Sequence, residues 1–423
     1  MRKNRIILVL AAVACLGSAV LWGCGADSGK TDGAGETDTN GVEEAAVLPA
    51  SEAKLGEGEK DGVTVTPLYD EKNHAITDMI TDGSAVYTVP AGVDGTYDIY
   101  LQVGKATSMV GTTIYDLAVN GTDRYALPIQ VVRADAEHTD LYDMGVFLMA
   151  EDVKLKEGDE IAVIGKDGYT TVYGENVFAS IPAIGDMLLF QAGTEVPIGY
   201  GDGELSKEET GDPSDPFSGK TICWLGSSVT YGAKAEGYSM ADAIAENHPG
   251  TTCLKYTISG TTLADNGSSS YVDRLKKDID PSRPLDLMVV QLSTNDAKAE
   301  AGLELGTVSE SRDPADFDAS TIIGGMETII AYTRNTWDCP VVFYTGTRYD
   351  SETYEQMVNA LYQLRDKWGI GIVDLWGNQE MTDIIGTDQY NAYMADATHP
   401  TELGYREWWT PEFEKVLPEY LMD

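Results

Sequence analysis

The sequence predicts an α/β domain, a flavodoxin-like three-layer α/β/α sandwich around a parallel sheet, preceded by an all-β sandwich or jelly-roll domain. With 423 residues, the chain is longer than one ordinary domain. Short runs with period-two alternation fill residues 61–198, without a helical period. Apolar runs and helical periods then alternate through residues 217–423, as in repeated βαβ units. We therefore expect two folded domains, joined by a linker at residues 199–216.

The N-terminal residues 1–24 have the pattern of a targeting segment. Three basic residues precede an almost wholly apolar run, Ile6–Leu21, which is too short for a comfortable membrane span. Leu21-Trp22-Gly23-Cys24 resembles a bacterial lipoprotein box, although Trp22 stands where a small residue is usual. The resemblance implies that Cys24 is lipidated and that the protein is extracellular, anchored to the bacterial cell membrane. An uncleaved membrane anchor is the alternative.

Residues 25–60 are rich in Gly, Asp, Glu, Thr and Ala and contain no aromatic residue. Such a segment buries too little apolar surface to offset its ordering entropy. We therefore predict a disordered stalk over these residues, which would hold the folded domains away from the membrane.

The charge of the chain limits its partners. Sixty-nine acidic residues against 29 basic ones give a formal net charge of −40. Such a surface repels phosphate backbones and anionic lipid headgroups. We expect no nucleic-acid partner, and membrane attachment through the N-terminal lipid only. Plain solubility is a common reason for such a charge.

Residues 61–198 carry the signals of an antiparallel sandwich. Tyr97–Val103 alternates with period two, Asn120-Gly121 is a tight-turn signal, and Lys156–Asp159 predicts a hairpin-type connection. The phrases Gly95–Tyr100 and Val153–Ile161 resemble the jelly-roll carbohydrate-binding modules of glycan-active enzymes. Tyrosine faces can stack on sugar rings, but tyrosine is also normal sheet filling. Both interpretations stay open for five tyrosines: Tyr87, Tyr100, Tyr115, Tyr125 and Tyr142.

After the linker, which is acidic and carries Pro213 and Pro216, apolar runs predict five buried strands of a parallel sheet. Between the strands lie helical periods, and Ser239 with Asp242 predicts a capped helix start. The predicted strands are Thr221–Leu225, Thr252–Tyr256, Leu285–Leu292, Pro340–Thr345 and Ile370–Leu375.

Polar residues follow these strands, at the sheet edge where α/β folds place their ligands. A serine hydroxyl such as that of Ser228 needs an adjacent base to act as a nucleophile, and histidine is the natural one. Of four histidines, His399 has a carboxylate three residues before it, Asp396, which can fix its tautomer. For His248, at a helix end, capping is the simpler explanation. A tight turn remains the alternative for Ser228.

Four blocks resemble, in order, those of the GDSL-type or SGNH hydrolases: Gly226-Ser227-Ser228, Gly260, Ser293-Thr294-Asn295-Asp296 and Asp396-Ala397-Thr398-His399. Two departures are Ser227 for the usual Asp and Ser293 for the usual Gly. The resemblance covers about 217–423 and implies a catalytic triad of Ser228, His399 and Asp396. The N–H groups of Ser228 and Gly260 and the Asn295 amide are expected to form the oxyanion hole. A strand-end cap is the alternative for Asn295.

The prediction is a surface-tethered serine esterase that removes small acyl groups, foremost O-acetyl, from a polysaccharide. No metal ion or organic cofactor is implied. A lipid or thioester hydrolase of the same fold is one alternative, and a non-catalytic glycan-binding lipoprotein is another. Cys223, Cys253 and Cys339 begin predicted strands and are expected to be small core residues, although a pair in adjacent strands could be bridged.

Overall fold

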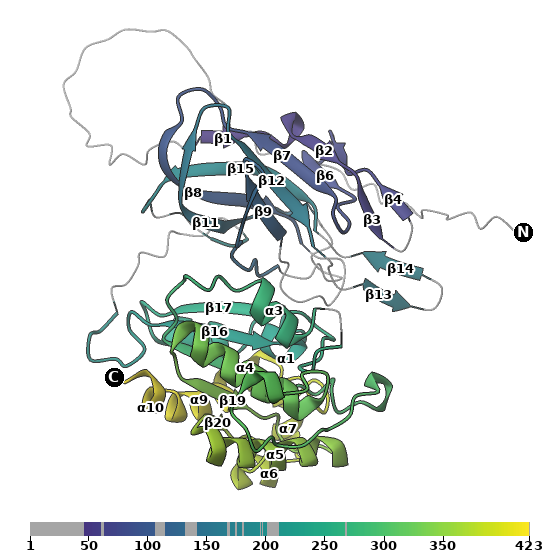
Figure 1. The fold of residues 1–423 in the computed structure, drawn as a ribbon, viewed down its shortest axis with the longest axis vertical. Coiled ribbons are helices and arrows are strands. Elements are labelled where there is room, and N and C mark those ends of the chain that lie inside the picture. The colour runs from purple at the N-terminus through teal and green to yellow at the C-terminus, as the bar shows by residue number, and fades with distance from the viewer. Residues whose placement is uncertain are drawn as a thin grey trace, which may run out of the picture. The chain divides into compact units, whose positions relative to one another are not determined.

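The computed structural model describes residues 46–60, 63–105, 115–131, 142–166, 170–173, 176–179, 182–194, 196, 198–200, 211–266 and 269–422 (Figure 1). The predicted targeting segment, including Cys24, and residues 25–45 of the predicted stalk lie outside these ranges. Within the described part of the chain, no helix is both long and apolar enough to cross a membrane.

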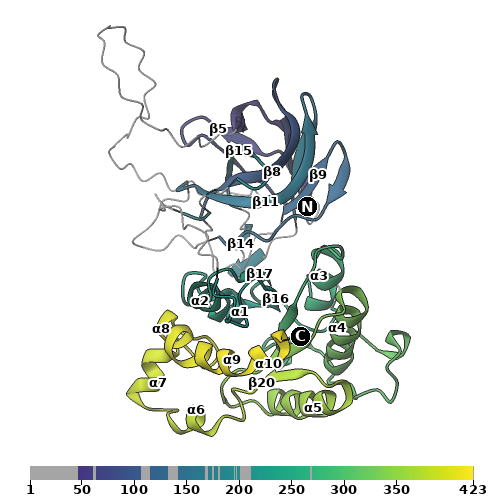
Figure 2. The same cartoon turned by 90° about the vertical axis from the view of Figure 1, so that its left-hand side faces the viewer.

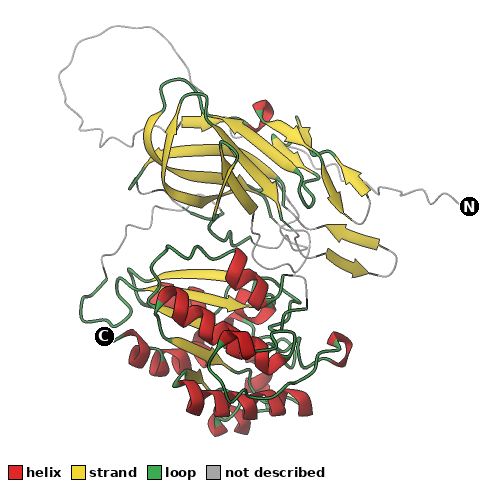
Figure 3. Ribbon diagram, viewed as in Figure 1, coloured by secondary structure: helices red, strands yellow, loops and turns green. Residues whose placement is uncertain are grey.

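The N-terminal domain consists of antiparallel sheets, as predicted (Figure 3). In the first sheet the order is β11 (Gly145–Lys156), β8 (Asp94–Val103), β15 (Ile184–Gln191), β6 (Ala75–Thr77) and β5 (Leu68–Asp70), and β1 (Ala46–Leu48) also pairs with β15. In the second the order is β10 (Thr122–Arg124), β9 (Tyr115–Val119), β12 (Glu160–Gly165), β7 (Ser84–Thr88) and β2 (Lys54–Gly56). Two two-stranded sheets, β3 (Gly58–Lys60) with β4 (Val63–Val65) and β13 (Thr170–Tyr173) with β14 (Asn176–Ala179), and a short 3-10 helix, Ala50–Glu52, complete it.

The two large sheets enclose one apolar core, because alternate side chains of each strand point inward. Ile99 and Leu101 of β8 and Ile161 and Val163 of β12 belong to the same buried cluster. Asn120-Gly121 forms the two-residue loop between β9 and β10, with positive φ at both residues. That turn prediction is confirmed.

The tyrosines of this domain divide between two environments. Tyr87, Tyr100 and Tyr115 are buried. The hydroxyl of Tyr87 donates to the Gly185 carbonyl at 2.7 Å, and that of Tyr115 donates to a carbonyl at 3.2 Å. These three are sheet filling, and they present no face for sugar stacking. Tyr125 is exposed.

Two sequence-based expectations for this domain are wrong in part. Residues 46–60, expected in the stalk, form β1, β2 and β3, because Leu48 packs into the sandwich core. Lys156–Asp159 does not close a hairpin, because β11 belongs to the first sheet and β12 to the second. The local turn signal is the same for both kinds of connection, so the sequence pattern alone does not separate them.

The C-terminal domain has the predicted five-stranded parallel sheet. Its order is β17 (Thr252–Thr257), β16 (Thr221–Gly226), β18 (Leu287–Gln291), β19 (Val341–Tyr344) and β20 (Gly371–Val373). The chain leaves β16 for β17 on one side and passes back to β18 on the other, so the strand order reverses between β16 and β18. Ligands of open α/β sheets bind at the carboxyl ends of the strands flanking such a reversal.

Helices cover both faces of this sheet (Figure 2). One face carries α3 (Tyr271–Lys277), α4 (Ile322–Trp337) and α5 (Glu352–Trp368), and the other carries α2 (Met240–Asn247) and α9 (Thr410–Val416). The predicted capping box of α2 is present at Ser239 and Asp242. The remaining helices are α1 (Ser228–Tyr231), α6 (Gln379–Asp383), α7 (Asp388–Tyr393), α8 (Glu402–Gly404), a π-helical turn (Tyr405–Trp409), α10 (Pro418–Leu421) and the 3-10 helices Ala299–Ala301 and Pro314–Asp316.

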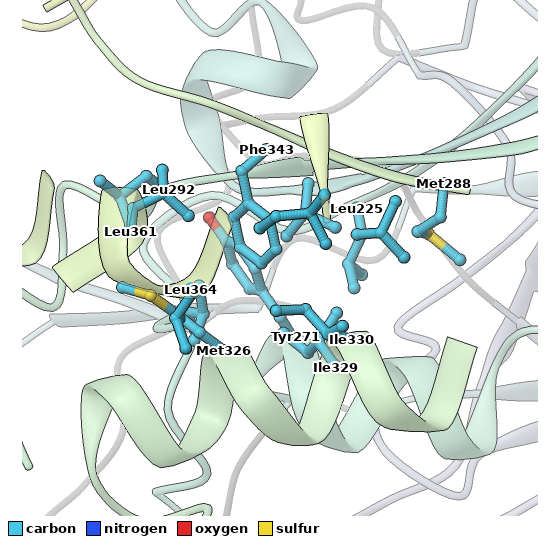
Figure 4. Close-up of a cluster of buried hydrophobic side chains, with 14 of the residues drawn as sticks. Leu225, Tyr271, Met288, Leu292, Met326, Ile329, Ile330, Phe343, Leu361 and Leu364 are labelled. Carbon is cyan, nitrogen blue, oxygen red and sulfur yellow. The ribbon is translucent and has the colours of Figure 1, made fainter. Parts of the chain in front are cut away.

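Strand alternation divides the apolar residues between the two helical layers. On β16, Leu225 faces the layer of α3, α4 and α5, whereas Trp224 faces that of α2 and α9. Figure 4 shows the first layer, where Leu225 and Phe343 of the sheet meet Ile329 and Ile330 of α4. This packing fixes the sheet, and with it the positions of the loops at its carboxyl edge.

Candidate active site

Ser228 stands where β16 turns into α1. The strand ends at Gly226, Ser227 occupies the N-cap position without a capping hydrogen bond from its side chain, and Ser228 is the first residue of the helix. A Cβ at Gly226 would lie 1.7 Å from the Thr230 hydroxyl, so only glycine fits this turn. The turn presents the partly buried Ser228 at the carboxyl edge of the sheet, as the sequence predicted.

The structure brings the Ser228, His399 and Asp396 side chains into a hydrogen-bonded row. Ser228 Oγ lies 2.7 Å from His399 Nε2, across 171 positions of sequence. His399 Nδ1 lies 2.9 Å from each carboxylate oxygen of Asp396. With the Nδ1 proton donated to Asp396, Nε2 is free to accept the serine proton.

The loop Asp396–His399 is folded around the aspartate. Asp396 Oδ1 accepts the backbone N–H groups of Thr398 and His399, both at 2.9 Å. A bridge between Met394 and Pro400 and a hydrogen bond from the Ala395 N–H to the His399 carbonyl close the base of the loop. This turn explains how a three-residue spacing outside a helix places the imidazole against the carboxylate.

The surroundings of Asp396 favour its ionised form. Partial burial opposes ionisation, but hydrogen bonds from the Thr398 N–H and the neighbouring His399 outweigh it and lower the pKa of Asp396. An ionised Asp396 is the form that accepts the Nδ1 proton of His399.

The residues expected to form the oxyanion hole end neighbouring strands. Gly260 follows β17 with φ of +82°, a conformation that favours glycine. Asn295 follows β18, and its amide Nδ2 donates to the Thr261 carbonyl at 2.9 Å and to Ser227 Oγ at 3.3 Å. Within the described ranges, neither the Ser228 N–H nor the Gly260 N–H donates to another protein group.

A buried carboxylate ties these two loops together. Asp296 accepts the N–H groups of Leu263 at 2.7 Å and Ala264 at 2.9 Å. Burial raises the pKa of Asp296, although these hydrogen bonds oppose the rise. The loop that follows Gly260 is thus attached directly to the loop that carries Asn295.

Two buried polar residues of the site were not identified from the sequence. Gln291, at the end of β18, accepts the Ser227 N–H at 2.9 Å and the Thr230 hydroxyl at 2.8 Å through Oε1. Arg274 of α3 donates to the Gly226 carbonyl at 2.8 Å. A polar residue within an apolar strand or on the apolar face of a helix was the available signal for both.

Other sequence candidates lie in structural roles. His248 is the residue at the C-cap of α2. Its Nδ1 lies 2.8 Å from Asp215 Oδ2, and its ring stacks on that of Phe217. The thiols of Cys223, Cys253 and Cys339 are free. Among the residues that the structure describes, no group of three or more His, Cys, Asp or Glu side chains could hold a metal ion.

Residues 224–407 match the model of the GDSL-like Lipase/Acylhydrolase family. These residues form a GDSL-type hydrolase domain. The match spans all four blocks of residues described above, from the nucleophile turn to the Asp396–His399 loop. The protein is therefore an enzyme that hydrolyses ester bonds. No curated protein matches the sequence.

Several solved structures resemble the chain at low sequence identity. A protein of Lactobacillus plantarum is 19% identical, covering 47% of this chain and 95% of its own, with a TM-score of 0.37. A family two carbohydrate esterase from Clostridium thermocellum, in complex with cellohexaose, is 11% identical over 86% of this chain and 97% of its own, with a TM-score of 0.38. An acetyl xylan esterase from the rumen bacterium Butyrivibrio proteoclasticus is 9% identical over 90% of this chain and 99% of its own, with a TM-score of 0.36.

Proposed function

We propose that the GDSL-type domain is a serine esterase whose triad is Ser228, His399 and Asp396. The observation that carries the proposal is the hydrogen-bonded row from Ser228 Oγ through His399, with distances of 2.7 and 2.9 Å. A nucleophile, a base within hydrogen-bond reach and a carboxylate that orients the base are the parts that acyl transfer requires.

The reaction follows from these positions. Ser228 Oγ attacks the ester carbonyl while His399 Nε2 takes its proton, and Asp396 stabilises the imidazolium that forms. The oxyanion binds the N–H groups of Ser228 and Gly260. The Asn295 amide joins them by turning one N–H from Ser227 Oγ, its longer contact at 3.3 Å, toward the oxyanion. His399 then protonates the leaving alcohol, leaving an acyl-enzyme. Water, deprotonated by His399, releases the acid and restores Ser228.

For the substrate, we propose small acyl esters, foremost O-acetyl groups, on a polysaccharide. Support comes from the antiparallel sandwich at residues 61–198, whose sequence resembles carbohydrate-binding modules, and from the lipoprotein-like signal ending at Cys24. A protein held at the bacterial surface would lie close to extracellular glycans. A lipid or thioester substrate would instead require an apolar groove beside Ser228.

Acetate release from acetylated xylan, mannan and peptidoglycan, by wild type and by Ser228→Ala, tests the proposal. Ser282→Ala, an exposed serine of the same domain, is the matched control. We expect release by the wild type and the control only. Ser228-dependent cleavage of an aryl acetate alone would keep the triad and reject polysaccharide as the substrate. Full activity of Ser228→Ala would reject the triad, and an inactive wild type would favour a glycan-binding protein.

The proposed anchor is tested separately from catalysis. Replacing Cys24 by Ser removes the thiol that would carry the lipid. We expect the wild type to incorporate a labelled fatty acid and to stay with the membrane fraction, and Cys24→Ser to do neither. Equal labelling of both proteins would contradict lipidation at Cys24.

A further inference from the structure

A fully buried guanidinium lies beneath the loops that carry the nucleophile and the expected oxyanion donors. The Arg274 side chain is 1% exposed. Its Nη2 donates to the Gly226 carbonyl at 2.8 Å and to Thr261 Oγ1 at 3.2 Å. Its Nη1 donates to the Tyr256 carbonyl and its Nε donates to the Ser269 carbonyl at 3.0 Å. One side chain thus joins α3 to the carboxyl ends of β16 and β17.

These acceptors belong to the elements that form the site. The β16 carbonyl lies two residues before Ser228, and Thr261 follows Gly260 directly. The Thr261 carbonyl in turn accepts the Asn295 amide at 2.9 Å. Arg274 and Thr261 therefore link the nucleophile strand, the Gly260 loop and the Asn295 loop in one continuous hydrogen-bonded chain.

The charge of Arg274 has no close counter-ion. All the acceptors named above are neutral, and among the described residues no carboxylate lies within 4.0 Å of the guanidinium. Burial lowers the pKa of Arg274 to about 10, although Asp273 and Asp278 favour its charged form. The side chain is therefore a cation at neutral pH. The guanidinium also lies 5.1 Å from the centroid of the Tyr271 ring, so its partners are neutral oxygens and an aromatic face. A buried charge without a carboxylate partner is unfavourable for folding, and proteins retain such features mainly at functional sites.

We propose that Arg274 is a positioning residue for the oxyanion hole, and that its charge stabilises the oxyanion formed there. This inference rests on the proposed esterase mechanism. The ester is neutral in the ground state, whereas the tetrahedral intermediate carries a negative charge on the former carbonyl oxygen. A fixed cation in a low-dielectric interior therefore lowers the energy of the intermediate and leaves that of the bound ester nearly unchanged.

A purely structural role for Arg274 predicts a different result. If the side chain only anchored α3, its loss would lower the stability and the fraction of active enzyme. Turnover by each correctly folded active site would not change. Turnover per titrated active site is therefore the quantity that separates the two roles.

The test compares Arg274→Met, which removes the charge, with Arg274→Lys, which keeps it on a head group that cannot bind several acceptors in a fixed fork. Active sites are titrated with a fluorophosphonate that labels Ser228, and kcat and KM are measured on p-nitrophenyl acetate. The matched control is Lys276→Met, which removes an exposed cation of the same helix. Thr261→Val removes the hydroxyl acceptor and serves if Arg274→Met does not fold.

We expect Arg274→Met to lower kcat per titrated site by roughly 10- to 100-fold, with KM within about twofold of the wild type. The kcat per titrated site of Arg274→Lys should lie between those of the wild type and Arg274→Met. Thr261→Val should show a smaller loss in kcat, and Lys276→Met should have the kcat and KM of the wild type.

Unchanged kcat per site in Arg274→Met would overturn the inference and leave the esterase intact. If Arg274→Met does not fold, unchanged kcat per site in Thr261→Val would overturn it. If the kcat per site of Arg274→Lys is no higher than that of Arg274→Met, the proposal that the charge stabilises the oxyanion would be overturned. A wild type that is neither labelled at Ser228 nor hydrolytic would overturn the proposed mechanism and this inference together.

Discussion

At the scale of single residues, the site depends on hydrogen bonds that orient each functional group. Asp396 holds the His399 ring with both carboxylate oxygens and also accepts two N–H groups of its own loop. Gln291 holds the turn that carries Ser228, because its Oε1 accepts the Ser227 N–H and the Thr230 hydroxyl. The reacting atoms are thus fixed before a substrate binds, which lowers the reorganisation that the reaction requires.

The lowered pKa of Asp396 predicts a pH dependence of stability. Because the folded state binds this proton less readily than the unfolded chain, stability falls as the pH falls. The contribution is complete above the ordinary pKa of 3.8 and is lost as the pH passes below the folded-state pKa. Asp396→Asn removes the titrating group. The free energy of unfolding of the wild type relative to this variant should shrink as the pH falls below 3.8.

Urea unfolding of the wild type and Asp396→Asn across this range measures the difference, which cancels the titration of the other carboxyl groups. Asp316→Asn, at an exposed position, is the control and should show no such change. A wild-type advantage that grows as the pH falls below 3.8 would contradict the assigned direction.

The sequence was sufficient to place some of these residues and not others. Ser228, His399 and Asp396 were predictable because each belongs to a local pattern and the chemistry requires their residue types together. Gln291 and Arg274 act on carbonyl and N–H groups contributed by distant segments. Such partners are defined only by the folded backbone, so no local pattern distinguishes these residues from other buried polar side chains.

At the scale of elements, hydrophobic patterning predicted the parallel strands well because each is buried on both faces. β16 and β18 are mainly apolar runs, and all five predicted strands appear in the sheet. Residues 46–60 were assigned wrongly because their strands have only three residues each. Few apolar side chains are needed to place such a strand at a sheet edge, so the composition resembles that of a disordered segment.

The pairing of β1 with β15 predicts a measurable contribution to stability. Leu48 is 2% exposed within the sandwich core, whereas its neighbour Val47 is 46% exposed. Leu48→Ala should lower the free energy of unfolding by roughly 2 to 4 kcal/mol, through lost burial and the cavity left behind. Val47→Ala should change it by less than about 0.5 kcal/mol. If urea unfolding shows that both substitutions lower the free energy of unfolding by the same small amount, residues 46–48 would belong to the predicted stalk and not to the sandwich.

At the scale of the whole molecule, the charge of −40 is independent of the fold and acts on every charged partner. Long-range repulsion lowers the local concentration of polyanions at the surface and slows their association. For an esterase with glycan substrates, this repulsion distinguishes neutral polysaccharides from those that carry carboxylates. Net charge would thus contribute to substrate choice without any contact in the active site.

Salt tests this contribution, because it screens the repulsion and leaves the triad unchanged. Raising the ionic strength from about 0.01 M to about 0.15 M shortens the screening length from about 30 Å to about 8 Å. The KM for an O-acetylated polyuronate should therefore fall over this range, while the KM for a neutral acetylated xylan and the kcat for both stay nearly constant. A parallel change for both polysaccharides would indicate a general effect of salt on the enzyme. No change for the polyuronate would mean that local contacts, and not the field of the whole molecule, decide between the two substrates.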